Sequence, residues 1–197
     1  IKNDTTKNNK LTLFFEIDEG PKVKIEDIIF KGNRALPDSK LRKAMKETKR
    51  KNFWRFWKAS KFIEKNYEDD KINLINKYNE FGYRDARILQ DTFYINSDNT
   101  ITIEMTIKEG ETYDFGDITF VGNKKYTNET LSKQLAIKKG EIYDQSILES
   151  RLLGSPEAND ISSLYLNDGY LFFNATPIEK STNNNEIDIE VRIYEGE

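Results

Sequence analysis

The sequence contains no cysteine and no histidine among its 197 residues. Without them the chain cannot build a cysteine–histidine zinc site, a thiol nucleophile or a Ser-His-Asp triad. The lack of cysteine also removes the disulfide pattern that would indicate a compartment. The remaining residues offer no spacing typical of a nucleophile–base pair or a metal cluster. We therefore expect no enzyme activity, no metal and no cofactor.

Long apolar runs and a strong net charge are missing as well. No segment approaches the roughly 18 consecutive apolar residues of a membrane-spanning helix. The 31 basic and 34 acidic residues leave a net charge of −3, which gives no general attraction to nucleic acid. No secretory signal is visible, but the sequence starts and stops within repeated motifs. We therefore expect the natural chain to continue at both ends.

The sequence does contain an internal repeat. Ile28-Ile-Phe-Lys-Gly-Asn33 returns 90 positions later as Ile118-Thr-Phe-Val-Gly-Asn123. A second pattern, Ile101-x-Ile-x-Met-x-Ile-x-Glu-Gly110, reappears at Ile187 to Gly196, and a related one at Leu11 to Gly20. A fixed period of this kind defines the structural unit. The sequence thus predicts the last strand of a preceding unit and two whole units, over 1–20, 21–110 and 111–197.

Apolar periodicity and turn residues predict the same element order, strand–helix–helix–strand–strand, in both units. In the first unit these are a strand over 23–30, a short helix from Pro37-Asp-Ser39, a helix over 63–81, and strands over 87–95 and 100–108. In the second they are strands over 113–120, 171–178 and 187–194, a short helix after Thr127, and a helix from about Gln145 that is interrupted over 154–160. Residues 1–10 are predicted to be a loop.

This order predicts an α+β fold with two layers, in which two helices cover one face of a three-stranded mixed sheet. Pro177 lies within the second strand of the second unit and cannot donate a ladder hydrogen bond, so that strand is expected at a sheet edge. The acidic cluster Glu68-Asp-Asp70 lies near a helix start, where carboxylates complement the helix dipole. We interpret it as structural rather than as a cation site.

Three motifs in this order resemble the POTRA domain family. They are the Ile-x-Phe-x-Gly-Asn end of the first strand, the pairs Gly82-Tyr83 and Gly169-Tyr170, and the Glu-Gly end of the third strand. The resemblance covers essentially the whole chain, in tandem. Within the family it is most similar to BamA-type outer-membrane β-barrel assembly proteins, with 21–110 resembling the third domain and 111–197 the fourth. The 154–160 insertion departs from this pattern.

The resemblance implies a periplasmic location, tethered to the outer membrane through a C-terminal barrel outside this sequence. It also implies binding of unfolded outer-membrane proteins, docking of accessory lipoproteins, contacts with neighbouring POTRA domains, and no nucleic-acid partner. Edge strands accept extended peptides through main-chain hydrogen bonds. The candidate client-binding residues therefore lie on the second strand of the first unit: Arg87, Leu89, Gln90, Asp91, Phe93 and Ile95.

Two other segments are candidates for function. The basic, aromatic stretch that contains Phe53, Trp54, Arg55, Phe56 and Trp57 either folds back on the helices as a satellite core or contacts a protein, a membrane or single-stranded nucleic acid. The short linker formed by Glu109, Gly110 and Glu111 predicts a limited hinge between the units.

Two alternative functions remain open. One is a POTRA pair from a related translocation or secretion pore. The other is a small RNA-binding α/β protein, which the net charge disfavours.

Overall fold

The computed structural model describes residues 2–6, 10–14, 23–50, 62–154 and 159–196. Lys2–Thr6 (β1) and Lys10–Phe14 (β2) form an antiparallel hairpin. The prediction of a loop over residues 1–10 is therefore wrong for residues 2–6 and 10, and the rest of that range lies outside the described residues. A polar segment forms a strand where a neighbouring strand satisfies its backbone hydrogen bonds, and composition alone does not reveal that neighbour.

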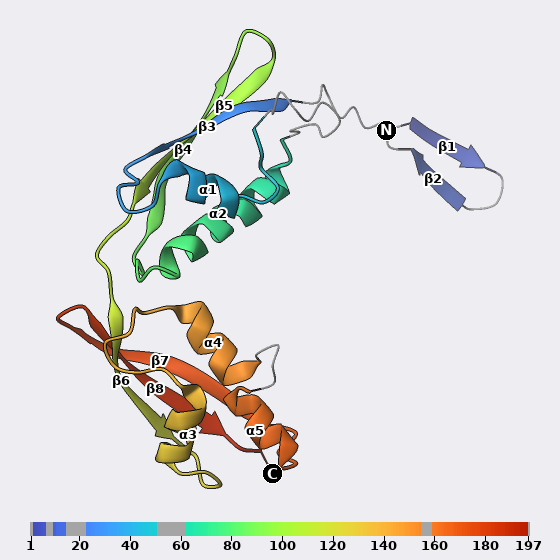
Figure 1. Cartoon of the computed structure of the whole chain (residues 1–197). Helices are drawn as coiled ribbons and strands as arrows, with labels where there is room; N and C mark the ends of the chain where they lie inside the picture. Colours follow the sequence, from blue (N-terminus) through green and yellow to red (C-terminus); the bar gives the residue numbers. More distant parts are fainter. Residues whose placement is uncertain (1, 7–9, 15–22, 51–61, 155–158, 197) are drawn as a thin grey trace.

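In the first unit, β5 is the central strand of the sheet, parallel to β3 and antiparallel to β4. Two helices, α1 and α2, lie on one face of this sheet (Figure 1). The elements are β3 (Lys24–Lys31), α1 (Asp38–Ala44), α2 (Glu64–Asn79), β4 (Arg87–Ile95) and β5 (Thr100–Lys108).

The second unit repeats this arrangement, with β8 between β6 and β7. The predicted interruption of its second helix falls between α4 and α5, and β7 begins at residue 174 rather than 171. The elements are β6 (Asp114–Val121), α3 (Asn128–Leu135), α4 (Gln145–Leu153), α5 (Ile161–Asn167), β7 (Asn174–Asn183) and β8 (Glu186–Tyr194). The predicted α+β class, with a three-stranded mixed sheet in each unit, is confirmed.

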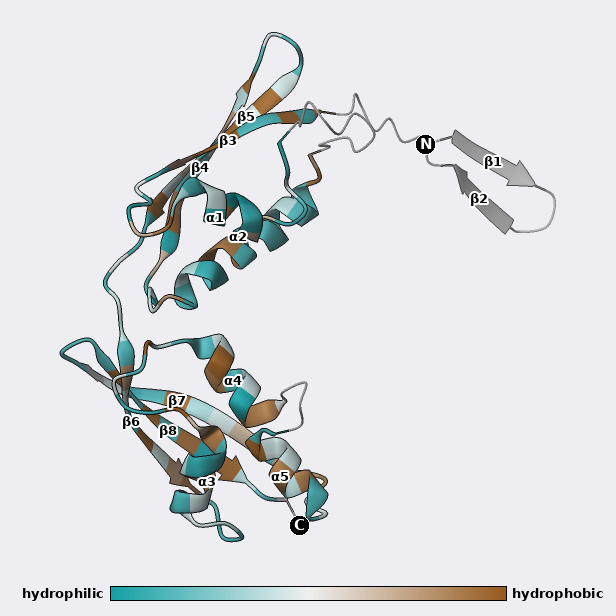
Figure 2. Cartoon of the chain, in the orientation of Figure 1, coloured by the Kyte–Doolittle hydropathy of each residue, from teal (hydrophilic) through white to brown (hydrophobic). Residues whose placement is uncertain are grey.

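Each unit has its own apolar core between its sheet and its helices. Apolar and polar residues alternate along the strands in Figure 2, and the buried set of β5 is the one that the alternation predicts. Buried side chains from the strands meet buried side chains of the helices: Ile101, Ile103, Met105, Leu41, Tyr67, Leu74 and Tyr78 in the first unit, and Ile187, Ile189, Val191, Leu131, Leu148 and Tyr165 in the second.

The two repeated signatures contact each other within each unit. Gly32 has a φ of +83°, and a Cβ there would lie 2.2 Å from the carbonyl oxygen of Ile107, so the turn packs directly on strand β5. Shortly after this turn, the backbone N–H groups of Arg34 and Ala35 donate to Glu109 Oε1 at 2.9 Å each. Gly122 and Glu195 repeat both contacts in the second unit.

The two units meet through side chains as well as through the connecting segment. Arg84, in the turn before β4, forms an ion pair with Glu179 of β7. Tyr113 lies just before β6; its Oη donates to Asp85 Oδ2 at 2.9 Å, and its backbone N–H donates to the Gly82 carbonyl, also at 2.9 Å. These contacts bring the turn before β4 against the start of the second unit.

Candidate functional site

Strand β4 is a free edge of the first sheet. Asn96 N–H donates to Thr100 O at 2.8 Å, and hydrogen-bonded pairs alternate along an antiparallel ladder from that point. The pairs of residues 94, 92 and 90 with β5 are therefore hydrogen-bonded. The N–H and C=O groups of residues 95, 93, 91 and 88 point away from β5, toward the open edge.

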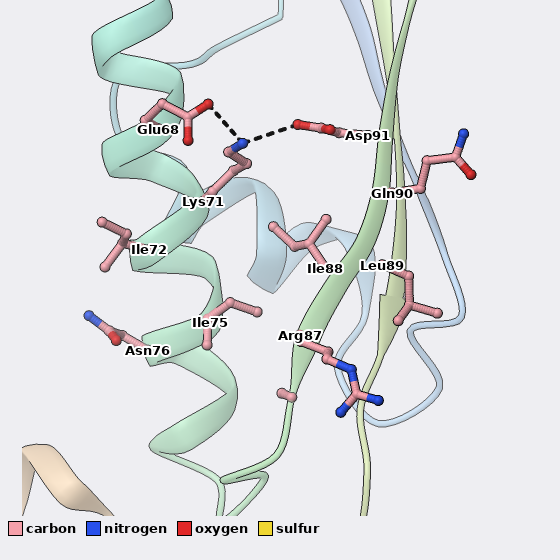
Figure 3. Close-up of a pocket in the computed structure, with 11 residues that line it drawn as sticks. Glu68, Lys71, Ile72, Ile75, Asn76, Arg87, Ile88, Leu89, Gln90 and Asp91 are labelled. Carbon is pink, nitrogen blue, oxygen red and sulfur yellow. Dashed lines mark hydrogen bonds and ion pairs between the residues drawn. The ribbon is translucent and has the colours of Figure 1, made fainter.

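A groove of about 480 Å³ runs between this edge and helix α2 (Figure 3). Ile72 and Ile75 contribute from the helix, and Ile88 points toward them from the strand. Ile72 is 61% exposed, so its apolar side chain is accessible beside the open backbone edge. The groove thus offers apolar surface and main-chain hydrogen-bonding groups together.

Ionic contacts close one end of the groove. Lys71 Nζ lies 2.7 Å from Glu68 Oε1 and 3.2 Å from Asp91 Oδ2 (Figure 3). Tyr67 Oη also donates to Asp91 Oδ2, at 2.8 Å. Partial burial acts to raise the pKa of Asp91, but the hydrogen bonds from Tyr67 and Lys71 outweigh it and lower that pKa. A charged Asp91 therefore holds β4 to α2.

The structure brings only part of the predicted edge set into the groove. Arg87, Leu89, Gln90 and Asp91 line it, but a bulge between residues 88 and 90 adds one residue to β4. Leu89 and Gln90 consequently both point away from α2 in Figure 3, whereas Asp91 points toward it. Because of this bulge, the strand cannot present one unbroken alternation of side chains to a partner.

The other two predicted edge residues lie beyond the groove. Phe93 packs edge-on against Phe62 and Tyr67, with ring centroids 5.4 and 5.3 Å apart. Ile95 is 82% exposed at the end of the strand. Phe93 therefore anchors the strand, while Ile95 is free to contact a partner.

Sequence reasoning missed the helix side of the groove, namely Lys71, Ile72, Ile75 and Asn76. One signal was available: Ile72 is a large apolar residue that lies off the buried stripe of Tyr67, Leu74 and Tyr78.

The remaining predicted sites have different outcomes. Phe53, Trp54, Arg55, Phe56 and Trp57 lie outside the described residues. Glu109 accepts hydrogen bonds from the turn after β3, as described above. Gly110 has a φ of +80°, and the hinge predicted at 109–111 stays a prediction.

Within the described ranges, no group of three or more acidic side chains is placed to hold a metal ion, and no helix has the length and hydropathy needed to span a membrane.

Strand β7 is the counterpart of β4 in the second unit. The two-residue turn at Asn184-Asn185 makes residues 183 and 186 a hydrogen-bonded pair. Every second residue of β8, starting from residue 186, is then hydrogen-bonded to β7. Val191 is not one of them, so Val191 and its partner Pro177 form a pair without mutual hydrogen bonds. Pro177 therefore costs the sheet no ladder hydrogen bond, and the donor it removes is one that would face the open edge.

Comparison with known proteins decides the family. A family model described as "POTRA: Surface antigen variable number repeat" matches residues 23–110 and again 113–196. The chain belongs to the POTRA family. Its two POTRA domains are the tandem pair that the repeat predicts, of the type found in BamA.

Two curated relatives are similar in sequence. A Treponema pallidum (strain Nichols) protein, provisionally described as an outer membrane protein assembly factor, is 33% identical over 161 residues. The outer membrane protein assembly factor BamA of Neisseria meningitidis serogroup B is 32% identical over 142 residues. These matches cover 78% and 70% of this chain but only 19% and 17% of the relatives. The matched part of the chain thus spans less than a fifth of their length.

A solved structure supports the fold. The POTRA3-5 region of Haemophilus influenzae BamA superposes with a TM-score of 0.63 at 17% identity, covering 92% of this chain and 70% of that one. At this identity the similarity establishes the POTRA fold and its tandem arrangement.

Proposed function

We propose that this POTRA pair binds unfolded outer-membrane proteins in the periplasm, by adding a segment of the client as a further strand beside β4. One observation carries the proposal: residues 88 and 91, whose backbone groups point outward, line a groove that also contains Ile72 and Ile75, and residues 93 and 95 continue the open edge beyond it. Docking of accessory lipoproteins, contacts with neighbouring POTRA domains and tethering through a C-terminal membrane barrel belong to the same proposal, and they rest on the names of the relatives.

Strand addition suits clients that share β-strand character and little else. Main-chain hydrogen bonds give affinity without demanding a sequence, while apolar side chains of the client can lie over Ile72 and Ile75. Ordering a mobile chain for so few contacts limits the affinity, so we expect a Kd of roughly 0.1–1 mM.

The second unit is expected to bind such peptides less well. Pro177 lacks an N–H group at a position where that donor would face the incoming strand. The preference for β4 over β7 therefore follows from the backbone alone.

A peptide titration followed by amide chemical shifts tests the proposal. A peptide of about ten residues from an outer-membrane strand should perturb the amides of residues 87–95. Ile95→Pro removes one outward donor at an exposed position, and loss of one such hydrogen bond should weaken binding about two- to tenfold. Ile95→Ala shortens the same side chain but keeps the N–H group, so its affinity should stay close to that of the wild type.

Melting temperatures near the wild-type value would establish that both variants fold. If Ile95→Ala weakens binding as much as Ile95→Pro, the peptide reads the side chain and strand addition is the wrong mechanism. Perturbation confined to the 50–58 segment, or none at all, would also overturn it.

A further inference from the structure

The same turn follows the last helix of each unit. In the first unit it covers residues 82–86, where Arg84 N–H donates to Gly82 O and Ala86 N–H donates to Tyr83 O. In the second unit it covers residues 169–173, with the same two hydrogen bonds shifted by 87 positions. Arg84 therefore corresponds to Leu171, and Asp85 to Phe172.

In the first unit this turn is covered by the next unit in the chain. Gly82 is buried, and a Cβ there would lie 2.9 Å from the carbonyl oxygen of Tyr113 and 3.0 Å from Cγ2 of Ile142. Arg84 and Asp85 supply the side chains of the joint, through Glu179 and Tyr113. At the first joint, then, the turn is a docking surface, and its side-chain contacts are an ion pair and a phenol–carboxylate hydrogen bond.

In the second unit the equivalent turn is open. A Cβ at Gly169 would meet nothing within 4 Å, and Leu171 and Phe172 are each 73% exposed. The course of the chain is otherwise the same. A Cβ at Gly110 would lie 3.2 Å from Asp85 Cβ, and one at Gly196 would lie 2.7 Å from Phe172 Cβ. The chain thus leaves each unit directly beside its turn.

We infer that Leu171 and Phe172 are the docking surface for a further unit of this fold that follows Gly196 in the natural chain. Three observations support this occupant: the covered equivalent at the first joint, the course of the chain past Phe172, and relatives about four times the length of this chain. Charged residues are replaced here by two adjacent apolar ones, so the second joint is closed by apolar contact. The following unit should accordingly carry apolar side chains where this one has Tyr113 and Glu179.

The inference is independent of peptide binding at β4, and it can be tested without a client. Because the chain has no cysteine, a single introduced thiol reports the exposure of one position. Phe172→Cys and Leu171→Cys are made separately, so that each leaves the other apolar residue in place. Both are prepared in the 197-residue chain and in a longer chain that runs through the next unit.

The introduced thiols should react with a maleimide at least about tenfold more slowly in the longer chain, because reaction then requires the joint to open. Ile95→Cys, at a position 82% exposed in the first unit, should react at the same rate in both chains. Equal rates at 171 and 172 in the two chains would overturn the inference. Slowing in the 197-residue chain that grows with protein concentration would overturn it too, since a second copy would then be the occupant.

Discussion

Glu109 joins three parts of the first unit at one carboxylate. It accepts from the backbone of Arg34 and Ala35 and from Tyr78 Oη, whose distance to Glu109 Oε1 is 3.0 Å. Burial, and then the hydrogen bond to Glu109, raise the pKa of Tyr78, so this phenol stays a donor throughout the physiological range. The Glu-Gly signature therefore holds the turn after β3 and the helix α2 to the end of β5.

Replacing this carboxylate should destabilise the first unit. Glu109→Ala leaves the buried Tyr78 hydroxyl and two backbone N–H groups without their acceptor, so we expect a loss of about 1–2 kcal/mol. Urea unfolding of the isolated pair measures it. Glu111→Ala, two residues away and exposed, is the matched control and should change the free energy of unfolding by less than about 0.5 kcal/mol. Equal effects of the two variants would contradict this role.

Asp70 shows where residue-level reading of the sequence falls short. Its position near a helix start predicts a role in complementing the helix dipole. The carboxylate is instead fully buried, and it accepts from the backbone N–H groups of Lys46 at 2.8 Å and of Glu47 at 2.9 Å, as well as from Thr48. These donors lie more than 20 positions earlier in the chain, and no local pattern connects them to Asp70.

At the scale of elements, the edge strand β4 depends on helix α2 for its position. Asp91 bonds to Tyr67 and Lys71 of the helix, while Phe93 packs on Tyr67. The edge that we propose for client binding is therefore held by β5 along one side and by these side chains on the face that α2 covers, while its outer side stays open. A rigid edge lowers the cost of adding a strand, because only the incoming chain must be ordered.

Asp91→Asn should weaken this connection in a pH-dependent way. The pKa of Asp91 is lower in the folded state than in the unfolded state, where it is near 4. The ionised carboxylate therefore stabilises the fold fully above the unfolded-state pKa. This contribution is lost as the pH falls through the folded-state pKa. We expect the variant to be about 1 kcal/mol less stable than wild type at pH 6, and this difference should shrink as the pH is lowered below 4 toward pH 2.5, by urea unfolding.

Asp69→Asn, exposed on the same helix, is the control for the loss of a carboxylate. It should change the stability by less than about 0.5 kcal/mol at either pH. If the difference between wild type and Asp91→Asn were the same at pH 6 and pH 2.5, the ionised carboxylate would not be the stabilising group.

Elements with a strong pattern of their own were predictable, and those that depend on a neighbour were not. Strands β4 and β5 begin and end at the residues that the sequence predicts, 87–95 and 100–108. The prediction rested on the alternation within each strand and on the turn that begins at Asn96. The bulge at Leu89 leaves no mark in composition, and it reverses which side chains face the helix. For the same reason the sequence indicated the strand side of the groove but not Lys71 and Ile72 opposite it.

At the scale of the whole molecule, a few polar contacts orient the two POTRA domains. Glu179 forms the ion pair with Arg84, and it also accepts a hydrogen bond from Tyr143 Oη, at 2.9 Å. The hydrogen bond from Tyr113, followed by the contacts with Arg84, lowers the pKa of Asp85 below its ordinary value of 3.8, so this carboxylate is ionised at neutral pH. Arg84, Asp85 and Glu179 are partly exposed, and exposed ion pairs contribute about 0–1 kcal/mol each. Such contacts favour one orientation without locking it, and the hinge at residues 109–111 stays a prediction.

Removing these side chains should widen the range of orientations. The double variant Arg84→Ala, Tyr113→Phe keeps both cores and the main-chain hydrogen bond from residue 113 to Gly82, but loses the ion pair and the phenol–carboxylate bond. Solution scattering should give a broader pair-distance distribution for the variant than for wild type. Lys133→Ala, at an exposed position of α3, is the control and should match wild type. If the variant and wild-type curves superpose, these contacts do not restrain the joint. A wild-type curve that one rigid arrangement fits completely would count against the hinge itself.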